Sequence, residues 1–152
     1  MIETKTPYYQ LSNGSQVSDI AMYLNFSIGN VIKYLFRAGK KENNDFQKDV
    51  KKALDYIQLE KNRIETLCSY TPCLNADAPL ENVKFNYLYL EKGIENKYAK
   101  RAIGMLQFYI FEQSRIVLNN VELLLKWLYE GKYEQLDYKF FNYQNKTKNE
   151  KI

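Results

Sequence analysis

Apolar and polar positions recur with a helical period through much of the chain, most clearly between residues 27 and 41. Ile28, Val31, Ile32 and Leu35 are three and four residues apart, which is the spacing of the buried side of an amphipathic helix. The pattern therefore predicts a helix here that turns this stripe toward a core. Its end signals are an N-cap and a C′ glycine, Ser27 and Gly39.

The same period predicts helices at four other places, residues 16–24, 45–67, about 96–118 and 121–129. Asn44 is the expected N-cap of the long helix at 45–67, and Gly131 is expected to end the last helix. Residues 83–90 alternate like a strand, but no partner strand follows them, so a helix is preferred. The predicted fold is all-α, a small helical bundle preceded by an extended N-terminal arm.

Breaks in the pattern divide the chain. Two prolines and two cysteines fall in residues 68–80, which we expect to be a loop between a helical region at 1–67 and another at 81–141. The second region is expected to pack on the first as one compact unit and to form a homo-oligomer through its apolar helices. Residues 142–152 are polar and are expected to be disordered.

Composition narrows the chemistry. The 152 residues are 45% hydrophobic and 26% charged, as in one soluble globular domain, and the net charge of +4 is too small to argue for nucleic acid by itself. No apolar run resembles a membrane span or a signal peptide, so a cytoplasmic protein is expected, with Cys68 and Cys73 as free thiols. The absence of histidine removes triad chemistry and the commonest transition-metal ligand.

A second face of the helix at 27–41 carries polar heads. Asn30, Lys33, Arg37 and Lys41 (or Lys40) follow one another at helical spacing, so their heads can converge. An amide, an ammonium and a guanidinium on one face suit an anion with several charged oxygens. The plainer interpretation, a solvated basic face on a core helix, is the one that spacing alone favours.

Acidic and aromatic residues extend this candidate site. Asp45 and Asp49 lie one helical turn apart, a spacing that suits a magnesium ion or a neutralising lysine; Lys48 or Lys52 is the preferred neighbour. Tyr8 and Tyr9 precede the first helix and either clamp the domain or stack on a ligand, with packing preferred.

Three segments together resemble one family. They are Pro7-Tyr8-Tyr9, the run from Gly29 to Lys41, and the run from Asp49 to Ile57. They resemble, in this order, the Pro…His-Tyr start, the GN-x-IKY-xx-R-x-G-x-K helix and the D-L-x-KA-xx-YL helix of the nucleotide-kinase-like family of tailed phages and prophages. Most of that family is catalogued as a domain of unknown function. The resemblance covers about residues 5–65, and its middle motif is the most specific.

The resemblance implies a phage or prophage protein in the host cytoplasm that phosphorylates deoxynucleoside monophosphates without a P-loop. Carried over by position, it places Asn30, Lys33, Arg37 and Lys41 near phosphate, with Asp49 and Lys52 facing them from the next helix. The expected catalytic residues are Lys33 and Asp49, and the expected ligand-binding residues are Tyr8, Tyr9, Asn30, Lys33, Arg37, Lys41 and Lys52. Tyr8 replaces the family's histidine, so binding without turnover is an alternative.

Three functions stay open at this point. The first is a nucleotide kinase, in which Asp49 holds magnesium or orients a lysine. The second is an anti-defence protein that binds a host signalling nucleotide without turning it over. The third is a protein–protein module; neither a membrane nor nucleic acid is an expected partner. For both nucleotide hypotheses, Arg37→Ala is expected to abolish binding with little loss of fold.

Overall fold

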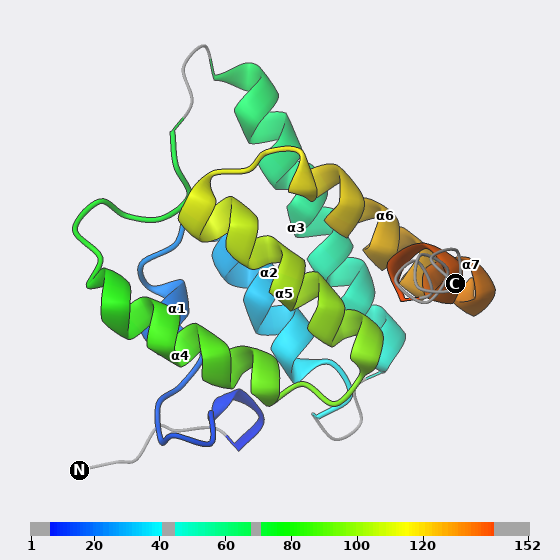
Figure 1. Ribbon diagram of the computed structural model, residues 1–152, viewed down its shortest axis with the longest axis horizontal. Coiled ribbons are helices and arrows are strands. Elements are labelled where there is room, and N and C mark those ends of the chain that lie inside the picture. Colours follow the sequence, from blue (N-terminus) through cyan, green and yellow to red (C-terminus); the bar gives the residue numbers. More distant parts are fainter. Residues whose placement is uncertain (1–6, 41–44, 68–70, 142–152) are drawn as a thin grey trace, which may run out of the picture.

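The computed structural model describes residues 7–40, 45–67 and 71–141 of the chain. A short 3₁₀ helix, η1 (Pro7–Tyr9), precedes the α-helices, which Figure 1 labels in order. These are α1 (Ser18–Ala21), α2 (Phe26–Arg37), α3 (Phe46–Thr66), α4 (Leu80–Lys92), α5 (Lys97–Glu112), α6 (Val117–Glu130) and α7 (Tyr133–Phe140).

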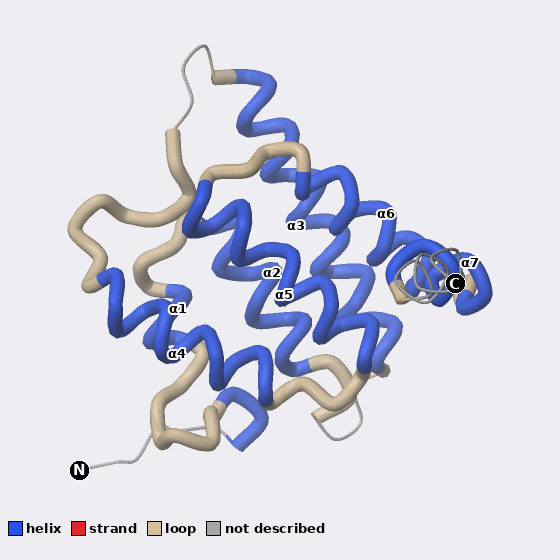
Figure 2. Tube along the Cα trace, in the orientation of Figure 1, coloured by secondary structure: helices blue, strands red, loops and turns tan. Residues whose placement is uncertain are grey.

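The described residues contain helices and loops but no β-strand (Figure 2), which confirms the all-α prediction. Residues 83–90 lie inside α4, so the preferred helix is confirmed and the strand alternative is wrong. Val83, Tyr87 and Leu90 are buried at helical spacing, whereas the residues between them are half-buried or exposed. The apparent alternation arose because aromatic residues also lie on the outer face of α4.

Helix α2 carries the predicted apolar stripe, and Ile28, Val31, Ile32 and Leu35 are all buried. Its N-cap is Asn25 rather than Ser27, because the Asn25 side chain accepts a hydrogen bond from the backbone N–H of Ile28 at 2.9 Å. Ser27 is instead buried in the first turn. Gly39 follows the helix with φ of 81°, the left-handed backbone that the C′ position needs.

Helix α3 is 21 residues long and packs against both α2 and α6. Asn44 lies outside the described residues, and the N-cap is Asp45, whose side chain accepts from the backbone N–H of Gln47 at 3.0 Å. The inner stripe of α3 includes Val50, Ala53 and Ile57, which are fully buried.

The C-terminal helices differ from the prediction in where they break. One helix was expected at about 96–118, but α5 ends at Glu112 and α6 begins at Val117. The break is at Gln113, which has a left-handed backbone with φ of 57° without being a glycine. Residues 133–140 lie in the predicted helical region at 81–141 but were assigned no helix of their own, and they form α7. Gly131 ends α6 as predicted, with φ of 74°.

The buried core joins the two regions of the chain. Helices α2 and α3 pack on α5 and α6, respectively, while α4 lies along one side of the molecule and α7 at the opposite end (Figure 1). The loop before α4 is fastened to the loop after α1, because Asn25 N–H donates to the Cys73 carbonyl and Asn75 N–H donates to the Tyr23 carbonyl, each at 2.8 Å. The division of the chain into a region at 1–67, a loop at 68–80 and a region at 81–141 stays a prediction.

Several expectations concern the loops and ends. Tyr8 and Tyr9 lie in the turn of η1 rather than in an extended arm, and a tight turn follows at Gly14, whose φ is 91°. Cys73 is a free, buried thiol, as expected, whereas Cys68 and the tail at 142–152 lie outside the described residues. Within the described part of the chain, no helix has both the length and the apolar character needed to cross a bilayer.

Candidate functional site

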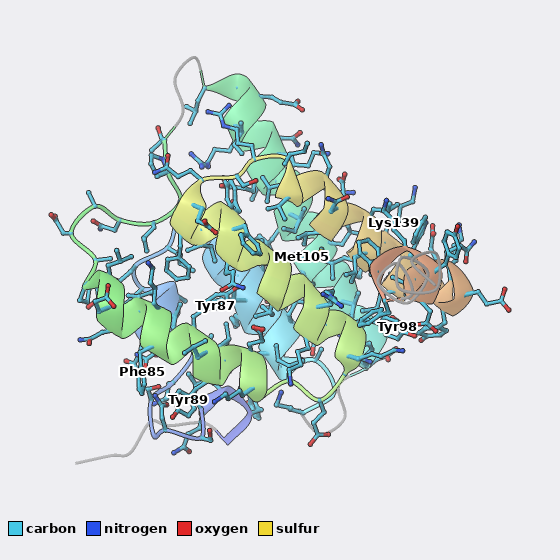
Figure 3. The ribbon with its side chains drawn as sticks, in the orientation of Figure 1. Phe85, Tyr87, Tyr89, Tyr98, Met105 and Lys139 are labelled. Carbon is cyan, nitrogen blue, oxygen red and sulfur yellow. The ribbon has the colours of Figure 1, made fainter. Side chains whose placement is uncertain are left out.

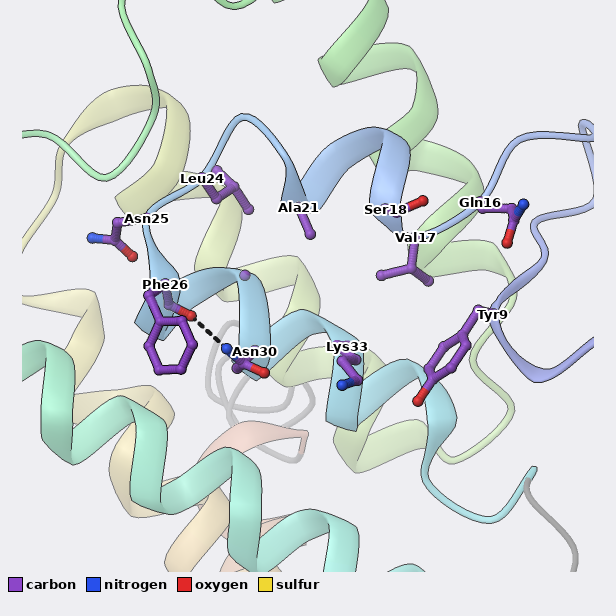
Figure 4. A pocket seen from close by; sticks show the side chains of 11 residues that line it. Tyr9, Gln16, Val17, Ser18, Ala21, Leu24, Asn25, Phe26, Asn30 and Lys33 are labelled. Atoms are coloured by element: carbon purple, nitrogen blue, oxygen red, sulfur yellow. Dashed lines mark hydrogen bonds between the residues drawn. The ribbon is translucent and has the colours of Figure 1, made fainter. Parts of the chain in front are cut away.

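A pocket of about 350 Å³ lies between α1 and α2 (Figure 4). Its volume is in the range of small-molecule sites. The α1 side contributes three apolar residues, Val17, Ala21 and Leu24. It also contributes the polar Gln16 and Ser18. The pocket is therefore a mainly apolar slot with polar groups at its edges, the arrangement that suits a small organic ligand.

Helix α2 forms the opposite wall of the pocket through Phe26, Gly29, Asn30 and Lys33. The helices approach closely at Gly29, where an added Cβ would be 3.4 Å from the Ala21 carbonyl oxygen. The Asn30 side-chain amide donates to the Phe26 carbonyl at 2.8 Å, which fixes its orientation along the helix. Asn30 therefore lines the predicted site with one polar group already engaged.

Tyr9 closes one end of the pocket, as Figure 4 shows. Its hydroxyl accepts a hydrogen bond from Arg37 Nη1 at 3.1 Å, and its ring meets the edge of Tyr8 with centroids 4.8 Å apart. Burial raises the pKa of Tyr9 above its ordinary value, more than the neighbouring guanidinium lowers it. The two predicted tyrosines are thus joined, and Tyr9 is the one that reaches the pocket.

Three predicted cations converge on a single aromatic ring, that of Tyr34. Lys33 Nζ is 5.1 Å from the ring centroid, Arg37 Cζ is 4.8 Å from it, and Lys52 Nζ of the next helix is 5.1 Å from it. The Tyr34 ring in turn stacks on Tyr56, with centroids 5.9 Å apart and an interplanar angle of 10°. Cation–π contacts of this kind attract each positive head to the Tyr34 ring.

Arg37 is occupied by an acid. Its guanidinium donates from Nη2 to Asp49 Oδ1 at 2.6 Å and from Nε to Oδ2 at 3.4 Å, and the Asp49 side chain is completely buried. This hydrogen-bonded carboxylate raises the pKa of Arg37 further above its ordinary value. The fork positions Arg37 between α2 and α3 and neutralises one of the three charges around Tyr34.

The arrangement changes the expected role of Asp49. Both of its oxygens accept from Arg37 inside the core, so the side chain is not placed to take a proton from a ligand or to bind magnesium. Asp45, the other acid of the pair, is used as the cap of α3. Among the described residues, no three or more acidic or thiol side chains are grouped where they could hold a metal ion.

Of the other cations predicted for the basic face at 27–41, only Lys40 belongs to the described residues, and it does not join the cluster. Lys41 lies outside the described residues. Lys40 turns back along α2: its Nζ donates to the Phe36 carbonyl at 2.6 Å and lies 4.0 Å from the centroid of the Phe36 ring. Burial lowers its pKa. Lys40 therefore caps the end of α2 rather than extending the cationic face.

Lys33 links the two parts of the site. It lines the pocket between α1 and α2, and its ammonium is also one of the three cations around Tyr34. A ligand whose flat part enters the pocket would therefore have its charged end beside Lys33 and within reach of the cationic cluster. The structure thus brings Tyr9, Asn30 and Lys33 to the pocket, and Lys33, Arg37 and Lys52 to the ring.

Tyr34 and Tyr56 were not singled out from the sequence, although a signal was present. Tyr34 is three residues before Arg37, and Tyr56 is four residues after Lys52. Residues three and four apart are neighbours on a helix surface, so each tyrosine is placed beside a predicted cation. Phe26 also lines the pocket, and its ring packs edge-to-face with that of Tyr56, with ring centroids 5.6 Å apart. It was missed because it lies at the helix start.

A buried acid supports the far end of the pocket. Both oxygens of Glu60 accept hydrogen bonds from Asn25 Nδ2, each at 3.1 Å, and the carboxylate also accepts from Arg63 and from the Tyr109 hydroxyl. Burial alone would raise the pKa of Glu60, but these donors outweigh burial and lower it. Because Asn25 lines the pocket, caps α2 and donates to Glu60, this network fixes the pocket wall.

Residues 15–58 match a family model described as a protein of unknown function (DUF3310). The match spans α1, α2 and the first two-thirds of α3, and so includes Asn30, Lys33, Arg37, Asp49 and Lys52. Tyr8 and Tyr9 precede it. Neither the curated proteins nor the solved structures give a match to this chain.

Proposed function

We propose that this protein binds a nucleoside monophosphate in the pocket between α1 and α2, with the phosphate beside Lys33 and Lys52. The base and sugar would occupy the apolar slot that ends at Tyr9. A phosphate monoester carries about two negative charges at neutral pH, and it would be held by the two ammonium groups that Asp49 does not neutralise. A nucleoside monophosphate has a base and sugar that suit the mainly apolar pocket and a compact dianion that suits the two lysines.

The observation that carries the proposal is the double position of Lys33. Its side chain lines the apolar pocket, and its ammonium is one of the three cations around the aromatic ring of Tyr34. A basic face without a pocket would fit many anions, and an apolar pocket without cations would fit many hydrophobic molecules. Because the pocket and the cations meet at Lys33, the site favours a ligand that has both an apolar part and an anionic part.

The resemblance of residues 5–65 to the phage nucleotide-kinase-like family supports the same ligand class and a phage or prophage origin. Phosphoryl transfer depends mainly on positioning and charge stabilisation, which Lys33 and Lys52 could supply. The burial of Asp49 against Arg37 leaves this carboxylate without the access that a catalytic base needs. We therefore favour binding without turnover, as in sequestration of a signalling nucleotide, over a nucleoside-monophosphate kinase.

Calorimetry on the full chain tests the binding. Deoxynucleoside monophosphates, with their di-, tri- and cyclic counterparts, are titrated with and without magnesium. Lys33→Ala is expected to weaken binding of the preferred nucleotide by about tenfold to a hundredfold, because it removes one charge-assisted contact to phosphate. Lys52→Ala is expected to have a similar but smaller effect.

Lys126→Ala on α6 is the matched control, since it removes the same charge from an exposed position on another helix. Equal affinities of Lys33→Ala and the control would exclude the proposed site, and no affinity for any nucleotide would favour the protein–protein module. Incubation with ATP, magnesium and the preferred monophosphate then separates the two nucleotide functions. We expect the acceptor monophosphate to stay unchanged; formation of the acceptor's own diphosphate, with ADP in equal amount, would establish a kinase.

A further inference from the structure

The outer face of α4 has a feature that the nucleotide proposal does not use. The helix buries Val83, Tyr87 and Leu90 against the molecule, and the side directly opposite exposes Phe85 and Leu88, with 54% and 52% of their surfaces accessible. Figure 3 shows Phe85 on the outer side of α4 and Tyr87 on the side toward α5. Large exposed apolar side chains on a helix face mark an interaction surface more often than isolated ones do.

Charged residues flank the two apolar ones on the same face. Glu81, Phe85, Leu88 and Lys92 follow one another at intervals of four, three and four residues, so a single stripe of α4 carries all four. Glu81 and Lys92 are both exposed. The stripe is symmetric about a point between residues 86 and 87: the acid and the base are equidistant from this point, and so are the two apolar residues.

We propose that this stripe of α4 binds a second copy of the same chain, with the two α4 helices antiparallel about a two-fold axis. A two-fold interface requires a self-complementary surface. An axis through the point between residues 86 and 87 places Phe85 of one copy against Leu88 of the other, and Glu81 of one copy against Lys92 of the other. Each contact occurs twice, and every charge meets its opposite.

One flank of the stripe is covered by a loop, and the other is open to a partner. On one flank, the loop before α1 is fastened to α4, because Asn13 donates to the Asn86 side chain at 3.0 Å. On the other flank, a hollow of about 710 Å³ between α4 and α5 is bordered by Phe85, Leu88 and Phe111. Side chains of a second α4 can enter this hollow, which extends the apolar contact beyond the stripe itself.

Charge exchange on the full-length chain tests the proposal, with dimerisation measured by analytical ultracentrifugation over a concentration series. Wild-type protein is expected to form a concentration-dependent dimer. Glu81→Lys and Lys92→Glu, made separately, each replace two attractions by two repulsions, and each is expected to weaken the dimer by about tenfold or more. The double variant Glu81→Lys/Lys92→Glu restores opposite charges across the axis and is expected to recover most of the lost affinity.

The double variant also separates dimerisation from helix stability. Glu81 in the first turn and Lys92 in the last turn both suit the dipole of α4 itself, so the exchange weakens the isolated helix while restoring the interface. Glu134→Lys/Lys139→Glu makes the same exchange in the first and last turns of α7 and is the matched control. A monomeric wild type, an oligomer unaffected by both single variants, or a double variant as weak as either single one would each overturn the proposal.

Discussion

Among single residues, Arg37 was predicted to bind a ligand, and in the structure it pairs with a buried acid. Its side chain is almost fully buried, and its guanidinium donates two hydrogen bonds to the completely buried Asp49. Removing one member of a buried ion pair leaves the other charge without compensation, which is far more costly than losing a surface pair. Substitution of Arg37 therefore affects folding as well as any bound phosphate.

We expect Arg37→Ala to lower the free energy of unfolding by about 3 kcal/mol, which replaces the expectation of little loss of fold. Urea denaturation at neutral pH measures the change. The double variant Arg37→Ala/Asp49→Ala is expected to be more stable than Arg37→Ala alone, because the orphaned carboxylate is gone. A loss below about 1 kcal/mol in Arg37→Ala would mean that water reaches Asp49.

The sequence predicted that Lys33, Arg37 and Lys52 lie on facing sides of two helices, but not which groups these side chains contact. Lys33, Arg37 and Lys52 meet at Tyr34 because their helical spacing places them on facing sides of α2 and α3. The pairing of Arg37 with Asp49 depends on how closely the two helices approach and on which groups this approach buries. Spacing within one helix contains no information about either.

At the scale of elements, the contact between the end of α4 and α2 depends on the absence of one side chain. A Cβ added to Gly93, the C-cap of α4, would be 2.7 Å from Cε1 of Phe36, whose ring is buried on α2. No real Cβ atom occupies such a position, and the ring has no free space to enter because interiors are close-packed. The helices must therefore separate if this position carries a larger residue.

Gly93→Ala is expected to destabilise the protein by about 1–3 kcal/mol through this overpacking. Gly104→Ala on α5 is the control, since the nearest neighbour of its added Cβ would be the flexible carboxylate of Glu91, at 3.2 Å. That variant is expected to be neutral or slightly more stable, because alanine favours a helix interior. Thermal melts of the two variants with the wild type make the comparison, and equal melting temperatures would contradict it.

The elements that sequence predicts well are those whose pattern is local. The buried stripes of α2 and α3 follow directly from apolar spacing, and so does the helical character of α4. The break between α5 and α6 does not follow from apolar spacing. Gln113 adopts a left-handed backbone there, and glutamine is not a residue type that predicts this conformation. Likewise, Asn25 replaces Ser27 as the cap of α2, since both are capping residues and the tertiary bond to Glu60 distinguishes them.

For the whole molecule, Glu60 joins elements that are distant in the chain. Through Asn25, Arg63 and Tyr109 it connects the start of α2, the body of α3 and α5, and Arg63 also donates to the Thr71 carbonyl at 3.0 Å. Because the folded protein lowers the pKa of Glu60, its charged form is stabilised by folding. This contribution is present above the ordinary pKa of about 4.5 and is lost as the pH falls through the lower, folded value.

We expect Glu60→Gln to cost roughly 2–3 kcal/mol at neutral pH and to reduce the loss of stability on acidification. Urea denaturation at pH 7 and below pH 4 gives both quantities. Glu65→Gln, at an exposed position of the same helix, is the control and is expected to leave the pH dependence unchanged. A Glu60→Gln variant that loses as much stability in acid as the wild type would show that other groups dominate.

The position of Asn25 has a consequence for how the pocket between α1 and α2 can change in related sequences. The same amide belongs to the wall of the slot, begins α2 and satisfies the interior carboxylate of Glu60, so altering that wall also weakens the scaffold. Gln16 and Ser18 border the slot from the α1 side without being buried. A lineage acquiring a new ligand preference would therefore accumulate its changes on the α1 rim, where recognition and stability are largely uncoupled.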